Sequence, residues 1–137
     1  MSELKENESM NIYSEDCPYI EIQWQEEGFF VSNAVLKLIG NPDIIRFQWN
    51  ATQRTLIIEP TNNNDPNGIF VTELTDTQQG VLFIGNSMLF YEIWHNSEWN
   101  DENCYRVVAK YNVPSNLAIF DIKKAIASDT YIDYDLG

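Results

Sequence analysis

Residues 29–60 have the sequence FFVSNAVLKLIGNPDIIRFQWNATQRTLIIEP, and the pattern of this stretch predicts a β-α-β-β unit. We expect a strand over 29–31, a short helix over 33–39, and two strands over 44–49 and 55–59, with Leu56 and Ile58 among the candidate inward residues of this hairpin. Ser32 or Asn33 is suited to cap the helix start, and Gly40 to end it. So short a helix is stable only when it packs against a sheet, so this unit requires a partner layer.

Residues 81–122, VLFIGNSMLFYEIWHNSEWNDENCYRVVAKYNVPSNLAIFDI, show the same order of elements. The expected elements are a strand over 81–84, a helix over 87–95 with Asn96 as its C-cap, and strands over 105–111 and 117–122. Phe30 corresponds to Phe83, Leu36 to Leu89, Ile45-Arg46-Phe47 to Tyr105-Arg106-Val107, and Ile57 to Ile119. We interpret the match as an internal duplication.

The rest of the chain fits around these two units. Residues 19–24 alternate as a strand with one buried face, residues 69–74 predict another strand, and residues 121–127 have the spacing of a third helix. The expected organisation is a flexible acidic leader (1–17), a first repeat (18–60), a linker (61–68), a second repeat (69–127) and an acidic tail (128–137) that docks or frays. The fold class is therefore β-rich α+β.

Charge limits the kinds of partner. The 137 residues include 21 acidic and 8 basic side chains, for a formal net charge of −13. Such a field repels nucleic acid and acidic membranes and accelerates encounter with basic proteins. There is no signal-peptide pattern and no apolar run near the ~20 residues that span a bilayer, so we expect a soluble cytoplasmic protein. Cys17 and Cys104 are expected to be free, buried thiols.

The first unit, VSNAVLKLIG followed by the hairpin that ends at Pro60, resembles the swapped-hairpin unit of the AbrB-like (SpoVT/AbrB, MazE-type) family of transcription regulators. The resemblance covers residues 19–60 and, through the repeat, extends weakly to 69–122. It implies that the two repeats form one pseudo-symmetric AbrB-like barrel. It also implies that basic residues near the first hairpin and helix contact DNA.

The positions that would contact DNA carry no positive charge in this chain. The corresponding turns, residues 25–28 and 76–80, contain no Lys or Arg, and the helices offer only Lys37. Neutralisation of phosphates supplies most non-specific DNA affinity, so direct nucleic-acid binding is not expected. Four cations fall on the later hairpins of the two repeats and are expected to pair with nearby carboxylates; they are Arg46, Arg54, Arg106 and Lys110.

Nothing in the sequence favours catalysis. The single histidine, His95, lies at a helix end, and no third group would orient a pair formed with Cys104. None of the CxxC, HExxH, GxGxxG, GxSxG or P-loop patterns occurs. The Asn- and Asp-rich residues 61–68 lack the spacing of an EF-hand. We therefore expect no enzyme, no cofactor and no metal site.

Acidic and aromatic residues alternate in several segments that we expect to be exposed, and tyrosine and tryptophan are preferred interface anchors. Trp99 in particular is expected to be exposed. The candidate partner-binding residues are Glu26, Glu27, Glu98, Trp99, Asp101, Glu102, Asp129, Tyr131, Asp133, Tyr134 and Asp135.

The function we expect is non-enzymatic binding, as a monomer or homodimer, of a basic protein such as a nucleic-acid-binding enzyme. An inhibitor of that kind is a DNA mimic, of the anti-CRISPR, anti-restriction or antitoxin-like type, from a phage or mobile element. Two alternatives stay open at this point. One is a divergent AbrB-like DNA-binding regulator, and the other is a structural phage or accessory component.

Overall fold

The structure is a computed structural model that describes residues 16–130 and 132–134. Its elements in chain order are β1 (Tyr19–Gln23), β2 (Gly28–Ser32), α2 (Asn33–Leu38), β3 (Ile44–Asn50), β4 (Thr55–Pro60), β5 (Ile69–Phe70), the 3-10 turn η1 (Val71–Glu73), β6 (Thr75–Asp76), β7 (Val81–Gly85), α3 (Ser87–Ser97), β8 (Cys104–Val108), β9 (Lys110–Asn112), β10 (Leu117–Asp121), the 3-10 turn η2 (Ile122–Lys124) and β11 (Ile126–Ser128). The expected β-rich α+β class is confirmed.

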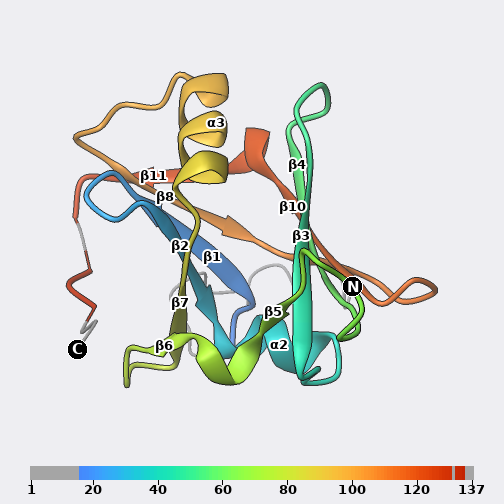
Figure 1. Cartoon of the computed structure of the whole chain (residues 1–137). Helices are drawn as coiled ribbons and strands as arrows, with labels where there is room; N and C mark the ends of the chain where they lie inside the picture. The colour runs from blue at the N-terminus through green and yellow to red at the C-terminus, as the bar shows by residue number, and fades with distance from the viewer. Residues whose placement is uncertain (1–15, 131, 135–137) are drawn as a thin grey trace, which may run out of the picture.

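The strands form two antiparallel sheets (Figure 1). Sheet A has the order β11-β8-β1-β2-β7-β6, and sheet B has the order β5-β3-β4-β10-β9. The main core combines apolar side chains from both sheets and both helices, with Ile20, Phe29, Leu56, Phe90 and Phe120 fully buried. Neither sheet closes on itself within the described residues, so no closed barrel is formed there.

The first predicted unit is confirmed element by element. The hairpin β3–β4 turns Leu56 and Ile58 fully into the core, as their alternation predicts. Gly40 follows α2 with a φ of 90°, which a glycine adopts without steric cost. The expected cap is wrong in one detail: the Ser32 hydroxyl makes no cap bond, and instead donates to the Cys17 carbonyl and accepts the Tyr19 N–H.

The second unit differs more from its predicted form. Helix α3 begins after Asn86, whose side chain accepts the Leu89 N–H, but it runs past the expected C-cap Asn96 to a left-handed Glu98 with a φ of 54°. The predicted strand over 69–74 is only the short β5 followed by η1. The predicted helix over 121–127 is instead η2 and strand β11, because β8 offers a free edge with which β11 pairs.

The predicted strand over 105–111 is divided between the two sheets. Its first part, β8, pairs with β1 in sheet A, and its second part, β9, pairs with β10 in sheet B. The break lies at Ala109, whose N–H donates to the Pro18 carbonyl. Because β3 lies in sheet B, the proposed correspondence between residues 45–47 and 105–107 is wrong.

Two other correspondences lie at equivalent places in the sheets. Phe30 lies directly opposite Phe83 where β2 pairs with β7. Ile57 lies directly opposite Ile119 where β4 pairs with β10. A local twofold axis between antiparallel strands passes between residues that face each other, so both pairs lie where such an axis would place them.

Strand β1 is buried on both faces, so the prediction of one exposed face is wrong. Ile20 and Ile22 point into the main core, while Tyr19 and Glu21 lie on the other face at 8% and 2% exposure. The described part of the tail covers that second face: Gln23 Nε2 donates to the Ile132 carbonyl, and the Tyr134 ring stacks on Phe30. Of the two outcomes left open for the tail, these residues dock.

Candidate protein-binding surface

The strand register brings three acidic segments to the same end of sheet A. Gln23, the last residue of β1, lies opposite Cys104, the first residue of β8, and Cys104 lies opposite Ser128, the last residue of β11. The β1–β2 turn, the α3–β8 loop and the chain that follows β11 therefore all emerge there, on the left of Figure 1. We call this region the acidic end; its carboxylates are those of Glu26, Glu27, Glu98, Asp101, Glu102, Asp129 and Asp133.

The β1–β2 turn is tied to α3 through Glu27. Its carboxylate accepts a hydrogen bond of 2.5 Å from the Tyr91 hydroxyl, and this bond raises the pKa of Tyr91. The Asn86 N–H also donates to the Glu27 carbonyl. Glu26 and Asp133 line one hollow of about 240 Å³ beside the docked tail. Two of the predicted segments thus contribute to a single surface.

The α3–β8 loop is held by aromatic packing, and the prediction that Trp99 is exposed is not met. The Trp99 ring is half-buried: it stacks on Tyr105 with centroids 4.2 Å apart and meets Trp94 edge-on. The Asn100 N–H donates to the Tyr105 hydroxyl. Trp99 therefore anchors the loop, while Glu98, Asp101 and Glu102 are exposed around it.

The tail residues separate into exposed and buried positions. Asp129 and Asp133 are exposed, whereas Tyr134 is buried at 8% exposure and does not belong to a surface patch. Burial raises the pKa of Tyr134, with a further contribution from the negative charge of Glu21. Tyr131 and Asp135 lie outside the described residues.

Beneath the tail lies a buried ion pair whose partners the sequence analysis did not connect. Arg106 Nη2 and Nε donate to Glu21 Oε1 at 2.5 and 3.1 Å, and the guanidinium also lies 3.7 Å from the centre of the Tyr19 ring. Nη2 also donates to the Tyr134 hydroxyl at 3.3 Å. Opposite charges in two strands were the available signal, but the pairing of β1 with β8 could not be read from the sequence.

The expected pairing of the other cations is confirmed only in part. Arg46 bonds to Glu59 and Asp65, as predicted. No bond to a carboxylate is seen for Arg54 or Lys110 within residues 16–130 and 132–134. Lys123 forms an ion pair with Asp121 and also donates to the Gln53 carbonyl. The segments that form the acidic end contain no Lys or Arg in their described parts, 24–27, 98–103, 129–130 and 132–134.

The thiols have little nucleophilic character. Cys17 and Cys104 are buried and neither takes part in a disulfide, as expected. Burial, and then the charge of Glu21, raise the pKa of the Cys104 thiol to about 11, so the reactive thiolate is scarce near neutral pH. His95 is exposed on α3, where its ring stacks on Tyr91.

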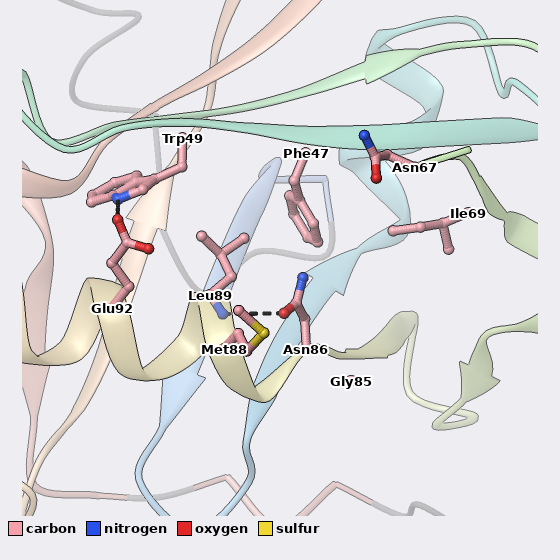
Figure 2. A pocket seen from close by; sticks show the side chains of 9 residues that line it. All are labelled: Phe47, Trp49, Asn67, Ile69, Gly85, Asn86, Met88, Leu89 and Glu92. Carbon is pink, nitrogen blue, oxygen red and sulfur yellow. Dashed lines mark hydrogen bonds between the residues drawn. The ribbon is translucent and has the colours of Figure 1, made fainter. Parts of the chain in front are cut away.

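A second concave feature lies between α3 and β3 (Figure 2). It is a groove of about 510 Å³, and no motif in the sequence indicates it. Its lining residues are Phe47, Trp49, Asn67, Ile69, Gly85, Asn86, Met88, Leu89 and Glu92. No group of three or more His, Cys, Asp or Glu side chains suited to a metal ion occurs in the described part of the chain. Within the same residues, no helix is long and apolar enough to cross a membrane.

Comparisons with models of protein families, with curated proteins and with solved structures found no match to this chain.

Proposed function

We propose that the protein is a non-enzymatic binding protein whose acidic end occupies a basic, nucleic-acid-binding surface of a partner protein. The observation that carries this proposal is the convergence of seven carboxylates from three segments at one end of sheet A, in segments whose described residues hold no Lys or Arg. Such a surface presents to a partner the kind of charge that a nucleic-acid backbone presents. The protein then acts as an inhibitor of the DNA-mimic type.

Electrostatics supports a protein partner over nucleic acid. A net charge of −13 gives long-range attraction to a basic surface and repulsion from phosphates. The carboxylates at the acidic end sit on elements fixed by the Trp99–Tyr105 stack and by the Tyr91–Glu27 hydrogen bond. A surface held in place before binding loses less conformational entropy when the partner docks.

The scaffold part of the proposal is a duplicated β-α-β-β unit of AbrB-like ancestry. The facing pairs Phe30–Phe83 and Ile57–Ile119 support a pseudo-twofold relation between the two halves. Strand β8 departs from that relation, since it inserts beside β1 in sheet A without an equivalent between α2 and β3. The segments that would face DNA in such a scaffold, residues 25–28 and 76–80, carry Glu26, Glu27 and Asp76 and no cation.

The test is capture of partners by matched charge variants. The triple variant Glu98→Lys, Asp101→Lys, Glu102→Lys changes the acidic end, and the control Asp43→Lys, Glu73→Lys, Asp76→Lys changes exposed carboxylates elsewhere. Each raises the formal charge by six, from −13 to −7. We expect wild type and control to retain the same nucleic-acid-binding protein, and the acidic-end variant to lose it. Equal capture by both variants would contradict the proposal.

A further inference from the structure

The groove between α3 and β3 lies beside a free strand edge. Strand β3 pairs with β4 along one side from Ile45 to Asn50, but on its other side β5 covers only Ile44 and Ile45. No backbone hydrogen bond is seen on that second side for residues 46–50 within the described part of the chain. The remaining five residues of β3 therefore present an edge on which another strand can pair.

This free stretch is longer than those on the other outer strands that the structure describes. β6 has two residues, and β9 and β11 have three each. The β3 stretch and β9 each carry one cation, Arg46 and Lys110. Arg46 bonds to Glu59 of β4 and to Asp65, whereas no bond to a carboxylate is seen for the exposed Lys110 in the described part of the chain. A charged side chain that projects freely from an edge discourages strand addition. The β3 edge is thus the place in the described chain best suited to extend a sheet.

The lining of the groove specifies the chemistry of a strand that would bind there. Figure 2 shows Phe47 and Leu89 facing the hollow from β3 and α3, with Met88 at its lip. Met88 is 84% exposed, and its flexible thioether adapts to different apolar side chains. Among the residues that line the groove, Glu92 alone carries a charge, and it accepts a 2.8 Å hydrogen bond from the Trp49 indole.

We propose that this groove binds an extended, basic segment of the partner protein, which pairs as an added strand with residues 46–50 of β3. Alternate apolar side chains of that segment fill the hollow between Phe47 and Leu89, and its Lys or Arg side chains lie near Glu92. Strand addition supplies affinity through main-chain bonds and specificity through pockets for alternate side chains. The inference rests on the proposed function, because it concerns the same basic partner.

Charge decides between the candidate occupants. A second copy of this chain would bring a second charge of −13 to the surface, and nucleic acid would bring phosphates beside Glu92. Like charges at an interface are unfavourable, whereas a basic segment neutralises the rim of the groove. The volume of about 510 Å³ lies in the range of pockets that bind ligands specifically.

The test uses three blocked hexapeptides as probes, followed by amide NMR of the isotope-labelled full chain. The first probe alternates lysine with valine and leucine, the second replaces its lysines by glutamate, and the third replaces its apolar residues by serine. We expect only the first to shift the amides of residues 46–50 and the Trp49 indole in a saturable way. No saturable shift there, or equal binding of the second or third probe, would overturn the inference.

Variants identify the site. Met88→Arg places a positive charge at the lip, and because Met88 is so exposed the fold should be unaffected; we expect at least about tenfold weaker binding of the first probe. Val113→Arg is the control, since Val113 is 70% exposed and does not line the groove. Glu92→Gln should weaken binding about two- to fivefold. Equal affinity of Met88→Arg and Val113→Arg would also overturn the inference.

The two proposals can fail separately. The acidic-end triple variant should still bind the first probe at β3, because its substitutions lie outside the groove. If the probe does not bind at β3 while partner capture depends on the acidic end, only the groove inference is wrong. If the probe binds at β3 while capture is unaffected by the acidic-end variant, only the proposed function is wrong.

Discussion

Replacing Arg106 by methionine should destabilise the protein severely, because it leaves the Glu21 carboxylate buried without its cation. Glu21 is 2% exposed and accepts two bonds from Arg106; among the described residues it would keep only the bond from Gln23 Nε2 at 2.6 Å. Removal of one partner from a buried ion pair costs about 3–5 kcal/mol. We expect a loss of that size in the free energy of unfolding, measured by urea titration with tryptophan fluorescence.

Two further variants isolate the cause of that loss. Arg46→Met removes a cation that pairs with Glu59 and Asp65 but is 38% exposed, so its cost should be only about 0–1 kcal/mol. The double variant Glu21→Leu, Arg106→Met removes both buried charges and should recover most of the stability. The reasoning is refuted if Arg106→Met costs no more than Arg46→Met, or if the double variant is less stable than Arg106→Met alone.

The remaining predictions concern packing and the thiols. Gly28→Ala should lower the free energy of unfolding by about 1–3 kcal/mol, because an added Cβ would lie 2.4 Å from the Ile84 carbonyl oxygen. Urea titration measures this loss, and unchanged stability would disprove the close approach of β2 to β7. Leu56→Ala, at a fully buried site, should lower the free energy of unfolding by about 2–5 kcal/mol, and Met88→Ala should lower it by less than about 0.5 kcal/mol. Equal losses for these two variants would contradict the assigned core. Since the pKa of Cys104 rises from 9.0 to about 11 on folding, that thiol stabilises the fold below pH 9, and the contribution is lost as the pH rises to about 11. At pH 8 its alkylation by iodoacetamide, followed by mass spectrometry, should be much slower than in urea, and equal rates would contradict the assigned burial.

Local patterns predicted the parts of the fold whose signals are local. Alternation placed Leu56 and Ile58 in the core, and Gly40 marked the end of the first helix. The internal match relates Phe30 to Phe83 and Ile57 to Ile119, and each pair lies directly opposite on neighbouring strands of one sheet. These signals depend on spacing within a few residues, or on similarity between two segments.

The errors arise where distant contacts decide the structure. β1 shows the alternation of a half-exposed strand, but Arg106 and Tyr134 cover its polar face from far along the chain. Residues 121–127 have helical spacing, yet residues 126–128 form a strand because they pair with the free edge of β8. The acidic neighbours of Trp99 predict an exposed side chain, but its ring stacks on Tyr105 and is half-buried. These partners are known only from the folded structure, so no local sequence pattern indicates them.

The candidate site was predicted in composition but not in arrangement. The exposed carboxylates of the acidic end were all named from sequence, and the register of β1, β8 and β11 brings their segments together. The sequence also predicts Tyr134 on this surface, and that prediction is wrong, because Tyr134 is buried against Phe30. No local pattern indicates the groove beside β3, because the groove depends on where β5 stops pairing with β3.

The central claim, that the acidic end takes the place of nucleic acid on a basic partner, is tested most directly by competition. The fraction of a labelled DNA duplex that stays bound to the captured partner is measured as each form of this protein is added. We predict that the wild type and the Asp43, Glu73, Asp76 control release the duplex, and that the Glu98, Asp101, Glu102 variant does not. Equal release by both variants, or a complex between this protein and the duplex itself at low salt, would contradict the account.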